Sequence, residues 1–426
     1  MTRLSPKHIE EVLKQAVNAK LISDQNPWIV FHNLDLYREK LRLIREAFPA
    51  NSLHTLAIKA NPLLELLRIA VEEEFGLEAA SFEEVQLALA SGCLPGRIFF
   101  DSPAKTKTEL RQALRLGVSI NADSFEELER INQIIESGFS SKVGLRINPE
   151  VGSGRISQTS VATINSKFGE SLKENKRAII KSFEHFPWLS GLHFHVGSQG
   201  CDLELLVAAA KRIADLLGLI SENFGNERVK WINIGGGIPA SYRDAAGVIE
   251  FRDYVSALKE VEGIFSNRRL LVTEFGRAVQ ANCGWAVSQV EYIKKKPETV
   301  LAVVHYGADY LMRAVYAPQD WAHEFLLCSK DGTLKEGSAR QVTIAGPLCF
   351  AGDLPGQHVM LPEPNISDLV VARDTGAYTL SLWSRHCNRA IPMVIGYSQD
   401  ISEFNFDVLH YREKPIDLIN QWGNNN

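Results

Sequence analysis

Lys59 is the residue whose setting first suggests chemistry, because it interrupts the apolar run TLAIKAN at residues 55–61. Burial disfavours an ammonium group and lowers the pKa of a lysine. A neutral lysine is a nucleophile that forms Schiff bases with carbonyl compounds. A lysine that marks the exit of a strand into solvent would give the same pattern, so Lys59 alone leaves both interpretations open.

Two histidines, His193 and His195, alternate in the run GLHFHVGS and would share one face of a strand. A pair of histidines could bind a metal ion, but no third ligand follows at a suitable spacing. The pattern therefore favours no metal site, and predicts one structural histidine and one that stacks on a ring.

Three consecutive glycines, Gly235, Gly236 and Gly237, follow the apolar run WINI. They would let backbone N–H groups approach an anion such as phosphate, although a tight turn needs the same residues. Ser198 ends another apolar run and would add a hydroxyl group to this anion site.

The run TEFGR places Glu274 and Arg277 at the end of a further apolar stretch. A carboxylate there could hold a protonated ring nitrogen, because a negative charge favours the cation. An ion pair without any ligand is the alternative for these two residues alone. Together with the lysine, the glycines and the stacking histidine, they supply the groups that pyridoxal 5′-phosphate requires.

Eight apolar, β-branched runs recur between about residues 53 and 276, each followed by a segment with helical periodicity. Buried strands that alternate with helices predict a parallel sheet, and eight such units predict a closed (β/α)8 barrel of the α/β class. A doubly wound open sheet would need a glycine-rich dinucleotide turn early in the chain, which is missing. Functional side chains of such barrels lie at the carboxyl ends of the strands. The runs are LHTLAIKA, FGLEAAS, RIFFDS, GVSINADS, KVGLRINP, GLHFHVGS, WINIGGG and LLVTEFGR.

The pattern changes after about residue 285, where strand-like runs follow one another without long helices. We expect a barrel domain over residues 35–284 and a C-terminal all-β domain over residues 285–426. Residues 1–34 would form a capped helix and a strand, and that strand would join the β domain.

Composition limits the classes of partner. The net charge of −5 gives no reason to expect nucleic acid, and no apolar run is long enough to span a membrane. The six cysteines contain no CxxC pair, which disfavours a zinc site or a disulfide framework and favours reduced thiols in a cytoplasm.

An ordered set of motifs resembles the fold-type III pyridoxal-phosphate decarboxylases, the group that holds diaminopimelate decarboxylase and eukaryotic ornithine decarboxylase. The resemblance runs from about residue 27 to about residue 412. The motifs are IKAN with Lys59, AASFEEVQLA with Ser81 and Glu84, LRINP with Arg146, SKFG at 166–169, HVGS at 195–198, GGG at 235–237, EFGR at 274–277, GPLC at 346–349 and DTGAY at 374–378.

The resemblance implies roles for residues of the barrel. Lys59 would hold the cofactor as a Schiff base, His195 would stack on its ring, and Glu274 would face the pyridinium nitrogen. That carboxylate argues against alanine racemase, which shares the barrel but has an arginine there. The phosphate would be bound by Ser198, Gly235, Gly236, Gly237, Arg277 and Tyr378. The cofactor would also be contacted by Glu78, Glu84, Arg146 and Gly276.

The resemblance also implies a homodimer with shared active sites. Cys349 resembles the cysteine that crosses the dimer interface and protonates the carbon left when CO2 departs. A non-catalytic, cofactor-handling protein with the same barrel is the alternative of another class. Such a protein lacks the second domain, so the length of this chain disfavours it.

Phe350 departs from the family pattern. Diaminopimelate enzymes have a glutamate after this cysteine and ornithine enzymes an aspartate, and the acid binds the distal ammonium of the substrate. Its loss removes a charge-assisted hydrogen bond of about 1.5–3 kcal/mol, unless Asp353 replaces it. Arg313 and Tyr316 are retained from the motif that binds the distal carboxylate, with one residue fewer between them.

Because Arg313 is retained and the acid at position 350 is lost, we expect an amino-acid substrate whose distal amine is capped by a carboxylate-bearing group. Citryl-ornithine and citryl-diaminopropionate, intermediates of siderophore biosynthesis, are examples. One alternative is decarboxylation of meso-diaminopimelate in lysine biosynthesis. The other is decarboxylation of a carrier-bound amino acid in natural-product assembly.

Overall fold

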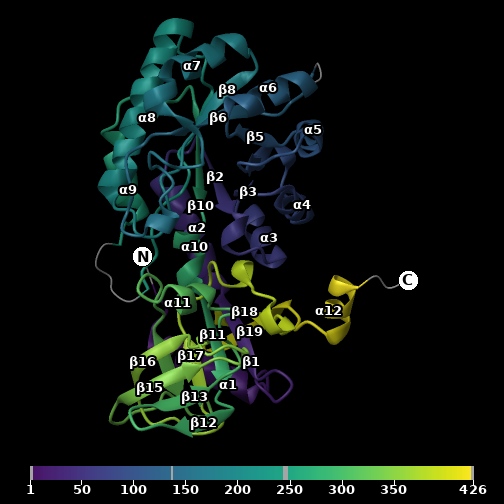
Figure 1. Ribbon diagram of the computed structural model, residues 1–426, viewed down its shortest axis with the longest axis vertical. Coiled ribbons are helices and arrows are strands. Elements are labelled where there is room, and N and C mark those ends of the chain that lie inside the picture. The colour runs from purple at the N-terminus through teal and green to yellow at the C-terminus, as the bar shows by residue number, and fades with distance from the viewer. Residues whose placement is uncertain (1–2, 136–137, 243–247, 424–426) are drawn as a thin grey trace. The chain divides into compact units, whose positions relative to one another are not determined.

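The computed structural model describes residues 3–135, 138–242 and 248–423 (Figure 1). They divide into two compact units. Of the described residues, the first unit contains those within 38–240 and 248–278, and the second contains 3–37, 241–242 and 279–423. Within the described residues, no helix combines the length and the apolar character that a membrane span requires.

Eight parallel strands of the first unit close into a barrel, which confirms the predicted fold. Each strand pairs with its neighbours in parallel, and the pairing of β5 with β6 closes the ring. The strands are β2 (Ser52–Ala57), β3 (Gly76–Ala79), β4 (Ile98–Asp101), β5 (Ser119–Ala122), β6 (Val143–Asn148), β8 (Leu189–His193), β9 (Trp231–Asn233) and β10 (Leu270–Phe275). The short β7 (Glu170–Ser171) pairs with the end of β6.

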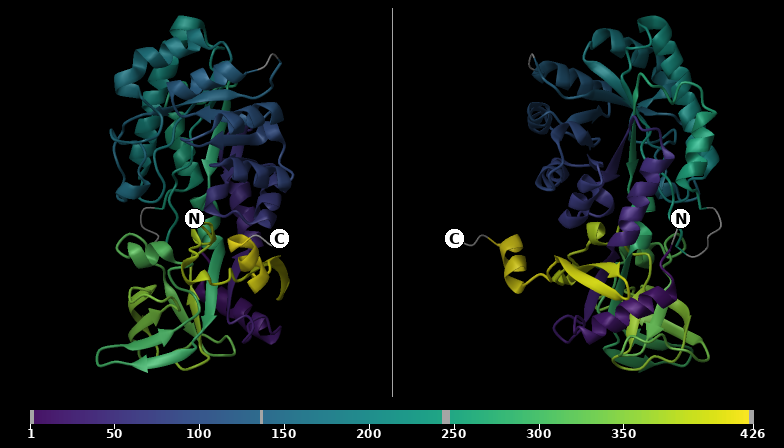
Figure 2. Two further views of the ribbon diagram at one scale, coloured as in Figure 1. Left: turned by 45° about the vertical axis from the view of Figure 1, so that its right-hand side comes forward. Right: turned by 180° about the vertical axis from the view of Figure 1, so that it is seen from behind.

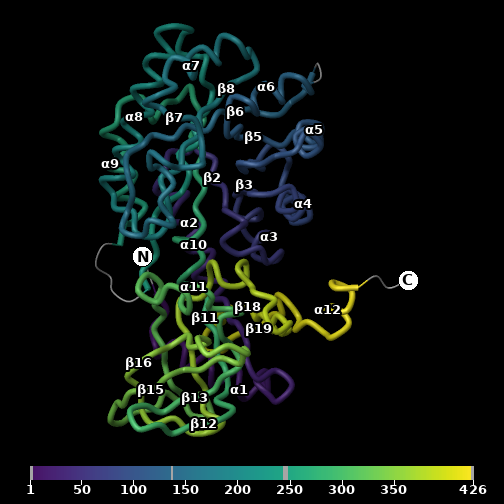
Figure 3. The backbone as a smooth tube through the Cα atoms, viewed as in Figure 1, coloured from purple at the N-terminus to yellow at the C-terminus, as the bar shows by residue number. Residues whose placement is uncertain are grey.

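Helices follow the barrel strands, and the backbone trace shows the alternation (Figure 3). Several begin at a serine, threonine or aspartate whose side chain accepts a backbone N–H of the first turn. The loops that follow β3 and β5 are therefore very short, whereas longer loops follow β6, β8 and β9. Helix α2 (Leu34–Ala47) precedes the first barrel strand. The helices that follow barrel strands are α3 (Leu64–Glu72), α4 (Phe82–Ala90), α5 (Lys107–Leu116), α6 (Phe125–Ile134), α7 (Leu172–His185), α8 (Leu203–Phe224) and α9 (Phe251–Lys259).

Trp231 fills the barrel interior near the amino ends of the strands. It packs with Leu53, Phe99 and Val272, all of them buried. Gly144 and Gly191 make room for the indole: a Cβ added at either position would lie 2.4 or 2.0 Å from its ring atoms, respectively. Because apolar side chains fill this level, the polar groups of the barrel are left at the carboxyl ends of the strands.

The second unit contains a six-stranded and a four-stranded sheet. Strand β1 lies inside the larger sheet, antiparallel to β11 and parallel to β18. The amphipathic helix α1 (Pro6–Asn18) packs its apolar face on that sheet (Figure 2). The larger sheet has the order β14 (Phe325–Cys328), β17 (Leu369–Ala372), β11 (Gly284–Gln289), β1 (Trp28–Asn33), β18 (Met393–Asp400) and β19 (Glu403–His410), and the smaller has β12 (Tyr292–Lys295), β13 (Val300–Val303), β15 (Arg340–Ala345) and β16 (Gly356–Leu361).

Short helices accompany these sheets. They are α10 (Arg277–Gln280), α11 (Met312–Tyr316) and α12 (Pro415–Trp422). Strands β14, β16 and β19 are additional to the runs recognised in the sequence. Strands β16 and β19 are largely exposed or partly buried, whereas β14 is a short apolar strand that is mostly buried.

Candidate active site

Lys59 lies in a single turn of 3-10 helix, η1 (Ile58–Ala60), directly after β2. The sequence predicted the lysine at the end of the strand, and the turn places it just beyond. Gly276, after β10, lets this turn pack closely, since a Cβ on it would lie 2.9 Å from that of Ala60. The ammonium Nζ donates to both carboxylate oxygens of Glu78 on β3, each at 2.6 Å.

Glu78 is fully buried, whereas the side chain of Lys59 is 37% exposed. Burial raises the pKa of Glu78 to about 8, although Lys59 lowers it, and the nearby Glu274 and Asp101 add to the rise. A carboxyl group in this range can exchange a proton with the lysine near neutral pH.

Arg146, on β6, lies between two buried carboxylates that follow neighbouring strands. Its Nη1 is 3.4 Å from Oδ2 of Asp101 and 3.7 Å from Oδ1 of Asp123. Nε2 of His193 is 3.2 Å from Oδ2 of Asp101. Burial acts to raise the pKa of Asp101, but Arg146 and His193 outweigh it and hold that pKa well below its usual range. The guanidinium also lies over the ring of Phe168, 4.5 Å from its centre.

Glu274, near the end of β10, is held through one oxygen only. Nδ2 of Asn233 donates to Oε1 at 2.5 Å, and Oδ1 of Asn233 accepts the N–H of Gly235 at 2.9 Å. The other oxygen, Oε2, is buried, and the described residues offer it no hydrogen-bond partner. A buried carboxylate oxygen with no protein partner is suited to accept a hydrogen bond from a ligand.

Asp101, His193 and Glu274 offer ligand atoms that lie within 4.8 Å of one another, as a metal site would require. The guanidinium of Arg146 already supplies the positive charge beside Asp101. A cation at this position would be repelled by that group, so the cluster fits a hydrogen-bonded network better than a metal site.

The three glycines form a turn that no other residue could form without movement. Gly235 and Gly237 have φ of +64° and +106°. A Cβ on Gly235 would lie 2.5 Å from Nδ1 of His195, and one on Gly236 would lie 2.4 Å from the carbonyl oxygen of Glu274. The turn therefore packs its backbone against the segments that carry His195 and Glu274.

His195 lies beyond the end of β8, and its Nδ1 accepts the N–H of Gly236 at 3.2 Å. Burial lowers the pKa of His195 well below its usual value, and the cations Lys59 and Arg146 lower it further. The ring is thus neutral, with Nε2 carrying the proton.

Ser198 and Arg277 lie together, as the anion site requires. Nε of Arg277 donates to Oγ of Ser198 at 3.0 Å. Gly237 approaches the backbone of Gly197, which precedes the serine. A hydroxyl group, a guanidinium and a glycine turn are a suitable set of groups for a phosphate.

Ser81 and Glu84 have a structural role at the start of α4. Oγ of Ser81 accepts the N–H of Glu84 at 3.1 Å, and the Glu84 carboxylate accepts the N–H of Ala80 at 2.7 Å. Helix capping accounts for both residues, and contact of Glu84 with the cofactor remains a prediction.

The remaining predicted residues belong to the second unit. The guanidinium of Arg313 lies 4.9 Å from the ring centre of Tyr378, and Tyr316 stacks on Phe350 at 6.0 Å with the rings 3° from parallel. Cys349 is exposed. Their contacts with the cofactor or the substrate remain predictions.

The carboxylate of Asp353 is bound by backbone N–H groups of its own loop and of a distant segment. Its carboxylate accepts the N–H groups of Ala308 and Leu348, each at 2.7 Å, and the side chain is buried. Glycines at 307 and 346 pack against it so closely that a Cβ on either would lie within 2.3 Å of a carboxylate oxygen. Asp353, the acid considered as a substitute partner for the distal ammonium, therefore already binds backbone N–H groups.

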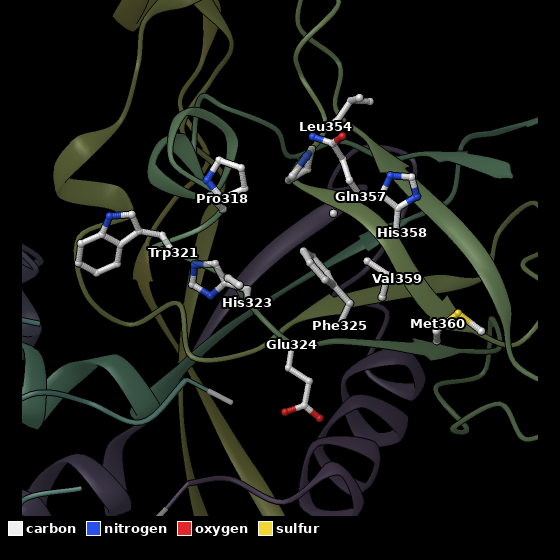
Figure 4. A pocket seen from close by; sticks show the side chains of 14 residues that line it. Pro318, Trp321, His323, Glu324, Phe325, Leu354, Gln357, His358, Val359 and Met360 are labelled. Carbon is white, nitrogen blue, oxygen red and sulfur yellow. The ribbon is translucent and has the colours of Figure 1, made fainter. Parts of the chain in front are cut away.

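A cavity of about 560 Å³ opens in the second unit (Figure 4). Trp321, His323 and Phe325 line one part of it, and His358, Val359 and Met360 line another. Among the described residues that line it, none is a predicted cofactor or substrate residue.

Sequence reasoning missed three residues of the barrel site: Asp101, Asp123 and Asn233. Each is a buried polar residue at or just beyond the carboxyl end of a barrel strand. That position was the available signal, since the same rule identified Glu274 and Ser198.

Comparison with known proteins places this geometry in a family. The family described as "Pyridoxal-dependent decarboxylase, pyridoxal binding domain" matches residues 34–281. The diaminopimelate decarboxylase of Helicobacter pylori is 29% identical over 400 residues, which are 91% of this chain and 93% of the relative. That of Methanothermobacter thermautotrophicus is 30% identical over 376 residues, 85% of this chain and 83% of the relative.

Solved structures agree with the sequence relatives. The crystal structure of the Helicobacter pylori diaminopimelate decarboxylase complexed with L-lysine has a TM-score of 0.83 at 26% identity, and covers 95% of this chain and 98% of its own. A Vibrio vulnificus lysine/ornithine decarboxylase complexed with cadaverine, at 21% identity and a TM-score of 0.76, shares the fold over 92% of this chain and 99% of its own.

Proposed function

The chain belongs to the pyridoxal-dependent decarboxylase family, and from that premise we propose that it removes the α-carboxylate of meso-diaminopimelate. It is an amino-acid decarboxylase with pyridoxal 5′-phosphate as its cofactor. The likeness to diaminopimelate decarboxylases over about nine tenths of the chain supports this substrate. The expected capped diamino acid has no such support.

The barrel residues fit the cofactor, and one observation carries the fit. Oε2 of Glu274 is buried without a hydrogen-bond partner among the described residues, in the same site as an amine and a glycine turn. A pyridinium N–H would satisfy that oxygen. Lys59 would hold the aldehyde carbon, and the phosphate would bind to Ser198, Arg277 and the three-glycine turn.

The chain's own groups account for the proton movements. When bound, the cofactor accepts the electrons of the bond to the departing carboxylate. Glu274 favours this by keeping a proton on the ring nitrogen. Glu78 can take a proton from Nζ of Lys59 and return it, because its pKa lies near neutrality. The thiol of Cys349 would deliver a proton to the α-carbon.

Phe350 supports a second candidate, the amino acid with a capped distal amine. Its ring stacks on Tyr316 where relatives offer a carboxylate, and Asp353 is occupied by backbone N–H groups. An aromatic wall accepts a capped amine, whereas a free ammonium would lose a charge-assisted hydrogen bond there.

One experiment separates the two candidates. CO2 release by the cofactor-loaded protein is measured with meso-diaminopimelate, L-ornithine, L-lysine and the citryl conjugates of ornithine and 2,3-diaminopropionate. Preference for diaminopimelate supports the proposal, and preference for a conjugate overturns it in favour of the second candidate. Phe350→Glu is the matched variant: it should improve turnover of a free diamine and impair that of a conjugate. Lys59→Ala is the inactive control.

A shared-site homodimer is part of the proposal, because Cys349 would act on a substrate held by the barrel of a second copy. Lys59→Ala and Cys349→Ala subunits, each inactive alone, should regain activity when mixed. Absence of recovery in a sample shown to contain heterodimers would mean that each chain forms a complete site.

A further inference from the structure

Cys349 and Cys387 are the exposed thiols among the described cysteines, and they are neighbours. The backbone N–H of Cys349 donates to Sγ of Cys387 at 3.4 Å, although 38 residues separate them. Since N–Cα is about 1.5 Å, Sγ of Cys387 lies within about 5 Å of Cα of Cys349. The two segments also meet one residue away, where the rings of Phe350 and His386 pack at 5.9 Å.

Both segments are held in place by the fold. Asp353 binds the N–H of Leu348, immediately before Cys349. Cys387 has a φ of +61°, a left-handed conformation that is uncommon outside glycine. Ring packing and backbone anchoring keep the thiols near each other, so side-chain rotation is the main movement needed to join them.

We propose that Cys349 and Cys387 form a reversible intrachain disulfide when the enzyme meets a disulfide oxidant such as oxidised glutathione. The thiolate of one cysteine attacks glutathione disulfide and releases one glutathione thiolate. The thiolate of the second attacks the resulting mixed disulfide and releases another glutathione. Two protein thiols are oxidised and one glutathione disulfide is reduced to two thiols.

The other four cysteines do not compete for this reaction. All are buried, and burial raises the pKa of Cys93 and Cys201 to about 11 and that of Cys328 to about 12. Those three thiols do not ionise near neutral pH, and burial keeps all four away from the oxidant.

The disulfide would remove the Cys349 thiol from the reaction. This consequence rests on the proposed function, whereas the bond itself does not. Oxidation would therefore stop proton delivery while leaving the barrel and its bound cofactor unchanged.

The test oxidises the holoenzyme with glutathione disulfide, alkylates the remaining thiols and maps tryptic peptides by mass. Cleavage at Arg340, Arg373, Arg385 and Arg389 should yield peptide 341–373 joined to peptide 386–389, with the loss of two hydrogen atoms. Activity should fall and return with dithiothreitol, while the visible absorbance of the cofactor persists.

Cys387→Ser should form no joined peptide, and Cys201→Ser, the buried control, should behave as the parent enzyme does. Absence of the joined peptide, a chain-to-chain disulfide on a non-reducing gel, or only a glutathione adduct at Cys349 would each overturn the inference. If the joined peptide forms and activity persists, the site stands and the role of Cys349 in the reaction fails.

Discussion

Asn233→Ala tests the assignment of Asn233 as the residue that positions Glu274. The amide makes two buried hydrogen bonds, one to Oε1 of Glu274 and one from the N–H of Gly235. Loss of the charge-assisted bond costs about 1.5–3 kcal/mol, and leaving the buried N–H unpaired costs about 1–3 kcal/mol. We expect the free energy of unfolding to fall by about 2.5–6 kcal/mol.

Thermal unfolding of the cofactor-free protein measures this change, which corresponds to a fall in Tm of roughly 10 °C for a domain of this size. Cofactor affinity should fall as well, because Glu274 and the glycine turn are both released. Asn51→Ala is the matched control, since Asn51 is exposed and bonds only to backbone carbonyl groups at the surface. A Tm for Asn233→Ala that equals the control's would refute the assignment.

Three further predictions concern buried or crowded positions. The raised pKa of Glu78 means that the parent protein loses stability as pH rises above the unfolded pKa of this acid, because the buried group must then ionise. Between about pH 5 and 8, Glu78→Gln should therefore gain roughly 2–5 kcal/mol of stability relative to the parent. A difference in urea midpoint that does not change with pH would contradict this. Asp353→Asn should speed amide exchange at Leu348 and Ala308. The control Asp320→Asn, at a half-buried aspartate that among the described residues accepts only from the neighbouring Gln319 side chain, should not. Equal protection in both variants would mean that the Asp353 carboxylate does not hold these N–H groups. Gly235→Ala should displace His195 and weaken cofactor binding, which an absorbance titration measures. The control Gly218→Ala, inside α8, has open space around the added methyl group and should stabilise the protein by about 0.5–1 kcal/mol. Unchanged cofactor affinity in Gly235→Ala would show that the turn tolerates a side chain.

The barrel could be predicted from the sequence because its signal is local. Each strand is a short apolar run, each helix has its own periodicity, and closure needs only that eight such units follow one another. Motif spacing likewise identified the lysine, the glycine turn, Glu274 and Arg277, since each lies at the end of one of those runs. Strands β14, β16 and β19 were not recognised: β14 is an apolar run of only four residues, β16 is mostly polar or exposed, and the alternating pattern of β19 was overlooked.

Contacts between distant segments were decided only by the tertiary structure. Asn233 and Glu274 are 41 residues apart, and Cys349 and Cys387 are 38 apart, so no local pattern couples them. Burial could not be predicted either: the sequence suggested that Asp353 was a free acid, whereas its buried carboxylate binds the N–H groups of Leu348 and of the distant Ala308. The sequence by itself determined the barrel and the kinds of group at its strand ends. Which of those groups meet, and which are charged, depends on chain closure and burial, and these arise only when remote segments pack together.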